Sequence, residues 1–260
     1  MKKVLCALFV AMFALSASVH AEGLLEEVQE RGKLIVGLEG NWAPWSYHDE
    51  EDALVGFDAD VARAIAGKLG VEADIVEGPW ESLFAGLDVG RYDVVINGVE
   101  VTEERGEKYD FSEPYAFIRT ALIVRSDNED ITSFEDLEGK NTVNSLGSTY
   151  MELAESYGAT AVGVSTLDET LSNVLNGRAD ATLNATVSFY DYLSVHPEAE
   201  LKIAALTEEA SLVSVPIRKD EADFKEAVDA AIEELREEGT LKELSEKYFG
   251  EDITAKEVEE

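Results

Sequence analysis

Reactive and cross-linking residues are scarce in this chain of 260 residues, which has one cysteine and three histidines. The cysteine, Cys6, lies in an apolar run near the N-terminus, so neither a disulfide nor a cysteine-bound metal is expected. No histidines and cysteines have the spacing of metal ligands, and there is neither a phosphate-binding glycine loop nor a Gly-x-Ser-x-Gly turn. The sequence therefore predicts no catalytic residue, no metal site and no cofactor.

Basic residues are also few, because 21 lysines and arginines stand against 55 aspartates and glutamates, for a net charge of −34. A chain of this charge is repelled by phosphate backbones and anionic lipids, so nucleic acid and membrane surfaces are poor partners. Acidic side chains also keep a protein dissolved, so a single Asp or Glu is weak evidence of a site.

The N-terminus has the features of an export signal. Lys2 and Lys3 precede an apolar run at 4–19, and Val19-His20-Ala21 resembles a cleavage site. The run is shorter than the roughly 20 residues of a membrane-spanning helix, and no later stretch is long and apolar enough. Residues 1–21 are therefore predicted to be a secretory signal peptide, with no lipid anchor evident on the exported chain.

Strand and helix patterns alternate through the rest of the chain. The first series comprises strands at 33–39, 71–77 and 92–97 with helices at 57–70 and 80–90 between them. The second comprises strands at 141–146, 159–165 and 179–184 with helices at 150–158 and 167–177. Alternation of this kind predicts parallel sheets flanked by helices, an α/β fold.

A short repeat relates the two series. "GRYDVVING" at 90–98 and "GRADATLNA" at 177–185 share Gly, Arg, Asp and Asn at identical offsets, each after a helix rich in leucine. A chance match of four residues is the alternative. The shared structural context favours two related α/β lobes.

Candidate ligand-binding residues follow from a general property of open α/β sheets, which bind ligands at the carboxyl ends of their strands. Thr102 is predicted to cap a short helix carrying Arg105, which follows the third strand. The remaining positions at strand ends are Glu39, Trp42, Trp80, Asn97, Gly98, Glu100, Ser148, Thr149 and Asn184. Tryptophan is often plain core, and that interpretation is preferred for Trp45.

These side chains suit the two charged ends of a zwitterionic amino acid. The planar guanidinium of Arg105 matches a carboxylate, as do backbone N–H groups where a helix begins at Ser148 and Thr149. An ammonium needs acceptors, which Glu100 and Asn184 supply.

The rest of such a ligand could lie between Trp42 and Trp80, through cation–π contact or through apolar and sulfur contact. Other interpretations remain open: Glu100 and Arg105 could form a surface salt bridge, and Glu39 and Glu100 could be a paired acid and base.

The sequence resembles the polar amino-acid-binding proteins of bacterial ABC importers, solute-binding family 3. The similarity covers essentially the whole chain after the signal peptide and lies in four segments: "GLEGNWAPWSYHDEEDALVGFDADVARAIAGKLG", "GRYDVVINGVEVTEERGEKYDFSEPY", "GRADATLN" and "GTLKELSEKYFG". This resemblance implies a two-lobed type II clamshell with two crossover strands, each lobe a mostly parallel sheet flanked by helices. It implies that lobe one comprises residues 22–117 and 213–260 and that lobe two comprises residues 118–212. It further implies a monomer in the periplasm that delivers a free amino acid to an ABC permease.

The resemblance also implies roles for individual residues. Arg105 and Thr149 would bind the ligand carboxylate, Trp42 and Trp80 would be aromatic walls, and Glu39 would face the ligand side chain. Gly98 would offer a backbone carbonyl to the ammonium.

Two positions depart from the family pattern, which usually has Ser or Thr where this chain has Glu100 and Asp where it has Asn184. One carboxylate has moved from the second lobe to the first. The "GLEG" and "YDFSEPY" segments are most similar to the cystine-binding branch, ahead of binders of basic amino acids and of glutamine.

Other classes are less well supported by the sequence. An exported dehydratase of the cyclohexadienyl or arogenate type shares the fold and uses acids in its cleft. A receptor module would need a membrane-spanning segment after the second lobe, and a purely structural protein would not need these residues at its strand ends.

Overall fold

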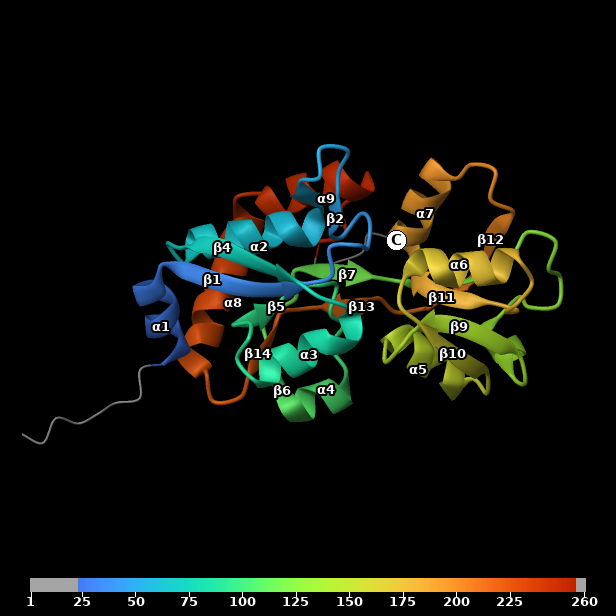
Figure 1. Cartoon of the computed structure of the whole chain (residues 1–260), viewed down its shortest axis with the longest axis horizontal. Helices are drawn as coiled ribbons and strands as arrows, with labels where there is room; N and C mark the ends of the chain where they lie inside the picture. Colours follow the sequence, from blue (N-terminus) through green and yellow to red (C-terminus); the bar gives the residue numbers. More distant parts are fainter. Residues whose placement is uncertain (1–22, 256–260) are drawn as a thin grey trace, which may run out of the picture.

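The computed structural model describes residues 23–255, which form two lobes side by side (Figure 1). The predicted signal peptide lies outside the described residues. Within residues 23–255, no helix is both long and apolar enough to cross a bilayer.

Lobe one is built on a parallel sheet of order β4-β1-β5, with β1 (Lys33–Leu38), β4 (Glu72–Glu77) and β5 (Val94–Val95). The intervening helices are α2 (Phe57–Lys68) and α3 (Trp80–Asp88). These are the predicted elements in the predicted order, although the third strand pairs over only two residues. Helix α2 forms because Phe57, Val61 and Ile65 give it one apolar face, and all three are buried.

Smaller elements complete lobe one on both sides of this sheet (Figure 1). They are α1 (Leu24–Arg31), the hairpin β2 (Tyr47–His48) and β3 (Leu54–Val55), α4 (Glu103–Lys108), β6 (Tyr109–Phe111), β14 (Pro216–Arg218), α8 (Ala222–Glu237) and α9 (Thr240–Phe249). The two C-terminal helices pack on α2, so the end of the chain returns to the lobe in which it began.

Lobe two combines parallel and antiparallel strands. Strands β9 (Asn141–Ser145) and β10 (Thr160–Val164) are parallel, whereas β8 (Thr120–Arg125) pairs antiparallel with β11 (Thr182–Ala185) and β12 (Leu201–Leu206). A parallel bridge between Thr142 and Ala181 joins the two sets. The helical elements are η1 (Phe134–Leu137), α5 (Thr149–Ser156), α6 (Leu167–Leu175) and α7 (Thr186–Val195).

The chain crosses between the lobes through two antiparallel strands, β7 (Ala116–Ile118) and β13 (Ser211–Val213), in the middle of Figure 1. Strand β8 follows β7 directly, so the chain enters lobe two in extended form, and β8 runs antiparallel to both of its neighbours there. The architecture is thus a two-lobed α/β fold with two crossing strands, and the residue bounds of the lobes stay a prediction.

Candidate ligand-binding site

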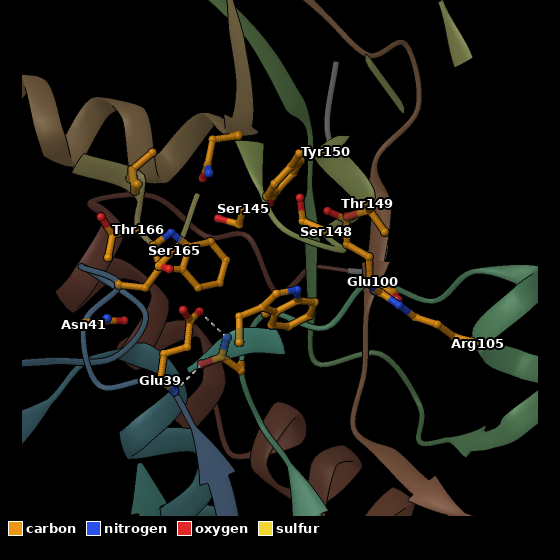
Figure 2. A pocket seen from close by; sticks show the side chains of 16 residues that line it. Glu39, Asn41, Glu100, Arg105, Ser145, Ser148, Thr149, Tyr150, Ser165 and Thr166 are labelled. Carbon is orange, nitrogen blue, oxygen red and sulfur yellow. Dashed lines mark hydrogen bonds between the residues drawn. The ribbon is translucent and has the colours of Figure 1, made fainter. Parts of the chain in front are cut away.

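A pocket of about 500 Å³ is lined by strand ends and helix starts from both lobes (Figure 2). All ten sequence-predicted residues line it: Glu39, Trp42, Trp80, Asn97, Gly98, Glu100, Arg105, Ser148, Thr149 and Asn184. Residues that are up to 145 positions apart in the chain therefore share one cavity. Their role in binding a ligand remains a prediction.

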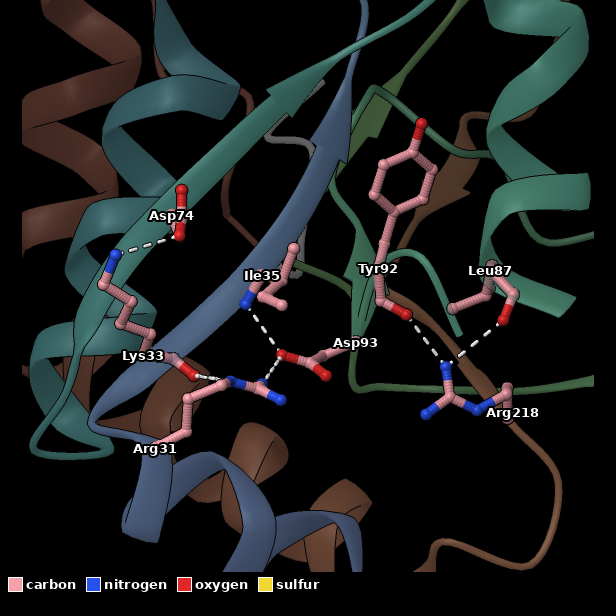
Figure 3. A network of polar contacts seen from close by, with 8 residues as sticks. All are labelled: Arg31, Lys33, Ile35, Asp74, Leu87, Tyr92, Asp93 and Arg218. Atoms are coloured by element: carbon pink, nitrogen blue, oxygen red, sulfur yellow. Dashed lines mark hydrogen bonds and ion pairs between the residues drawn. The ribbon is translucent and has the colours of Figure 1, made fainter. Parts of the chain in front are cut away.

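The repeated segments bring equivalent residues to this pocket from the two lobes. In lobe one, Asp93 exchanges backbone and side-chain hydrogen bonds with Ile35 at 2.8 and 2.7 Å (Figure 3). In lobe two, Asp180 makes the same two bonds with Asn141, both at 2.8 Å. Asp93 thus holds β1 and Asp180 holds β9, so the asparagine four residues later reaches the pocket in both copies.

Further contacts hold the repeated segment of lobe one, residues 90–98, in place (Figure 3). Arg31 contacts the carboxylate of Asp93. Arg218 donates from Nη1 to the backbone oxygens of Leu87 at 3.2 Å and Tyr92 at 2.8 Å. These bonds join α1 and β14 to the turn before β5, which stiffens the strand that leads to Asn97 and Gly98.

Glu39 is held by Asn97 at the floor of the pocket. The backbone N–H of Glu39 donates to Oδ1 of Asn97, and Nδ2 of Asn97 donates to Oε2 of Glu39, both at 2.8 Å. Burial raises the pKa of Glu39 to about 7, against the hydrogen bond from Asn97 and with a smaller contribution from the charge of Glu81. Near neutral pH this carboxyl can accept a hydrogen bond or donate one.

The indole of Trp42 forms one wall and depends on Gly98. Trp42 stacks on Trp45 with ring centroids 5.2 Å apart and planes 17° apart, and Trp45 is fully buried, as predicted. Gly98 has φ of +55°, and a Cβ there would lie 2.7 Å from the ring of Trp42. Only glycine fits, because a side chain would meet both backbone strain and the indole.

Arg105 lies between aromatic rings and a backbone oxygen. Its guanidinium carbon is 5.4 Å from the ring centre of Trp80 and 5.3 Å from that of Phe84, and Nη1 donates to the backbone oxygen of Glu100 at 2.9 Å. Thr102 caps α4 by accepting from the backbone N–H of Arg105, as predicted. Within residues 23–255, Arg105 has no carboxylate within salt-bridge distance, so the surface salt bridge with Glu100 does not form.

Glu100 is the buried acid of the pocket, with 7% of its surface exposed. Its backbone forms a bridge with Val213 of the crossing strand β13, which places the residue at the boundary between the lobes. Burial raises the pKa of Glu100, although nearby hydroxyls and the charge of Arg105 oppose that shift. A cationic ligand group would stabilise this buried carboxylate, which forms no ion pair within the described residues.

Lobe two contributes a helix start and an amide. Ser148 caps α5 by accepting from the N–H of Met151 at 3.2 Å, so Thr149 lies in the first turn, where backbone N–H groups lack intrahelical acceptors. Asn184, at 3% exposed, accepts the N–H of Ala185 on Oδ1 at 3.0 Å. That oxygen keeps one lone pair with which to accept from a ligand.

Six further residues line the pocket and escaped the sequence analysis: Asn41, Ser145, Tyr150, Ser165, Thr166 and Leu167. Ser145 ends β9, and Ser165 and Thr166 follow β10, so the rule of strand ends applied to every strand would have found them. Tyr150 carries no such signal, because it is the second residue of a helix and is 6% exposed.

A polar pocket between two α/β lobes joined by crossing strands is the architecture of a type II solute-binding protein. The family model of bacterial extracellular solute-binding proteins, family 3, matches residues 34–251. The chain belongs to this family.

Curated relatives and solved structures agree with that assignment. The chain is 36% identical to the L-cystine-binding protein TcyA of Bacillus subtilis, over 98% of this chain and 100% of TcyA. The L-cystine solute receptor of Neisseria gonorrhoeae, in an unliganded open conformation, is 39% identical with a TM-score of 0.63, covering 90% of this chain and 100% of the receptor. A mutant of ArgBP from T. maritima is 31% identical with a TM-score of 0.80, covering 88% and 100%. The clamshell fold and the solute-binding role predicted from the sequence are confirmed.

Proposed function

We propose that this protein captures a zwitterionic L-amino acid, with L-cystine as the first candidate, and delivers it to an ABC importer. The observation that carries the proposal is the convergence of Arg105 and Glu100 on one pocket with aromatic walls. A half-buried cation, Arg105, and a buried anion, Glu100, without an ion pair between them suit a ligand that brings one charge of each sign.

The two ends of the ligand would bind at the lobe boundary. Arg105 and the amides at the start of α5, at Ser148 and Thr149, take the carboxylate. Glu100 takes the ammonium, with Asn184 as a neutral acceptor. Trp42, Trp80 and the backbone of Gly98 surround the α-carbon region.

The ligand side chain would extend toward the floor of the pocket, where Glu39, Asn41, Ser165 and Thr166 provide polar groups from both lobes. Cystine has a second ammonium and carboxylate for such a surface, and its disulfide sulfurs suit contact with aromatic rings. The names of the curated relatives support this choice. Basic amino acids, which would pair with ionised Glu39, rank next, followed by glutamine.

Binding rather than catalysis is part of this proposal. A dehydratase needs a proton donor placed against a leaving group, and the pocket acids Glu39 and Glu100 have the alternative role of ligand acceptors. Incubation with prephenate and with arogenate should give no turnover, measured by absorbance of the aromatic product. Turnover that disappears in Glu100→Gln would replace the binding function with the enzymatic one.

Export and delivery are also proposed on the basis of the family and the N-terminal sequence. The chain would lose residues 1–21, reside in the periplasm and act as a monomer on its permease. N-terminal sequencing of protein from the periplasmic fraction should begin at Glu22, and light scattering should give the monomer mass with and without ligand.

Calorimetric titration tests the central proposal. Protein unfolded and refolded to remove any carried ligand should bind L-cystine more tightly than any of the twenty amino acids at pH 7. Binding of arginine or lysine in preference to cystine would revise the ligand, and binding of none of these compounds would refute amino-acid capture.

A further inference from the structure

Two buried polar atoms face the same part of the pocket without partners. Within residues 23–255, neither Oε1 of Glu100 nor Oη of Tyr150 has a hydrogen-bond partner, although both residues are more than nine-tenths buried. The two groups affect each other's protonation. Burial is the largest cause that raises the pKa of Tyr150, and the Glu100 carboxyl raises it further, whereas the Tyr150 hydroxyl lowers the pKa of Glu100. A buried acceptor and a buried donor that line one pocket and lack other partners can satisfy each other with a small side-chain rotation.

The two residues come from different lobes. Glu100 precedes α4 and is bridged to the crossing strand, whereas Tyr150 lies in the first turn of α5, and both point into the cavity in Figure 2. A hydrogen bond between them would join lobe one to lobe two beside the ligand.

The other groups around Glu100 favour its ionised form. The crossing strand β13 presents the hydroxyl of Ser211, α5 presents those of Thr149 and Tyr150, and α4 presents the cation of Arg105. Every one of these groups lowers the pKa of the carboxyl, and only burial raises it. The backbone N–H of Ala185 acts in the opposite direction to burial on the Tyr150 hydroxyl, since it lowers the pKa of Tyr150 and so makes the hydroxyl a better donor.

We propose that Tyr150 is a positioning residue, whose hydroxyl donates to the Glu100 carboxylate across the lobe boundary and keeps that carboxylate ionised and oriented for the ligand ammonium. Recognition of the ammonium and approach of the two lobes are then one event, because the same carboxylate takes part in both. The inference rests on the proposed function for its ligand but not for the carboxyl–hydroxyl contact itself.

Tyr150→Phe isolates the hydroxyl, because the ring belongs to the main hydrophobic core and phenylalanine preserves its packing. Tyr157→Phe is the matched control, since Tyr157 ends the same helix and its ring stacks on Phe134, away from the pocket. Ser211→Ala removes a second hydroxyl that lowers the pKa of Glu100, from a different element of the fold, β13. Melting temperatures establish that each variant folds.

The first readout needs no ligand. Infrared or carbon NMR titration of the Glu100 carboxyl, assigned with Glu100→Gln, should show a higher pKa in Tyr150→Phe and in Ser211→Ala than in the wild type or Tyr157→Phe. The direction follows because a lost donor destabilises the carboxylate relative to the acid.

The second readout is the affinity for L-cystine between pH 4 and 9. Binding needs ionised Glu100, so affinity falls as pH drops through its pKa, and in Tyr150→Phe that fall should occur at higher pH. We expect binding about tenfold weaker than wild type at pH 5 and within about threefold at pH 8.

An unchanged carboxyl titration in Tyr150→Phe, with affinity either unaffected or reduced equally at every pH, would overturn the proposal and leave Tyr150 a core residue. If Tyr150→Phe fails to fold, an unshifted carboxyl in Ser211→Ala would equally overturn it. Failure of the wild type to bind any amino acid would refute the proposed function, while the ligand-free titration would still decide this inference.

Discussion

The most specific test of the site restores the residues that the family usually has at the positions of Glu100 and Asn184. Glu100→Ser removes a carboxylate that is 7% exposed and lies in the pocket with Asn184. Asn184→Asp keeps the oxygen that accepts the N–H of Ala185 and replaces the amide nitrogen with a second oxygen. The double variant therefore returns the carboxylate to lobe two, where the family usually has it.

The magnitude follows from the burial of Glu100. Removing the charged partner of a desolvated ammonium costs about 2–5 kcal/mol, or about thirty-fold to several-thousand-fold in affinity. Asn184→Asp alone should give little gain or a loss, because two carboxylates sharing one ammonium repel each other and one takes up a proton. Against the Glu100→Ser background, the same change should recover at least about fivefold, a coupling of about 1 kcal/mol.

Calorimetric titration of L-cystine into the wild type, both single variants and the double variant at pH 7 measures the cycle. Glu103→Ser is the matched control, because Glu103 is an exposed acid near Glu100 that does not line the pocket, and it should bind as wild type does. Strictly additive effects would show that the two positions do not share an ammonium. That result would refute our explanation of why the carboxylate moved.

Three further changes test separate parts of the site and its support. Arg105→Ala should abolish measurable L-cystine binding by calorimetry with the melting temperature nearly unchanged; affinity near that of the wild type would assign Arg105 to the surface instead. Gly98→Ala should lower the affinity for L-cystine and also the unfolding free energy in urea, the latter by about 1–3 kcal/mol, because its Cβ would meet the ring of Trp42. Gly90→Ala is the control for backbone strain alone, since Gly90 also has a positive φ but has open space around it. Equal losses of unfolding free energy in the two variants would contradict the steric argument. Asp58 is fully buried, and burial raises its pKa from 3.8 to about 8. The unfolded chain therefore ionises first as pH rises, and this carboxyl destabilises the fold increasingly between pH 4 and 8, by at most about 6 kcal/mol. Asp58→Asn should therefore gain stability relative to the wild type as pH rises in urea unfolding, and a constant difference between the two would contradict the shifted pKa.

The sequence by itself determined the order of the elements and most of the pocket. Apolar periodicity is a local property, so the strand at 33–39 and the helix at 57–70 could be recognised from their own residues. The ends of parallel strands meet at one sheet edge, so residues as distant as Glu39 and Asn184 could be assigned to one site before any contact was known.

The tertiary structure alone decided how those residues act on one another. Glu100 and Tyr150 are 50 positions apart and line one pocket only because the two lobes pack together, and nothing in either local sequence encodes that proximity. The same holds for the pKa of Glu39 near 7, since it is raised by burial in a pocket that only the folded chain forms. Periodicity and strand ends depend on neighbours along the chain, whereas desolvation and pairing depend on neighbours in space, which exist only after the chain has folded.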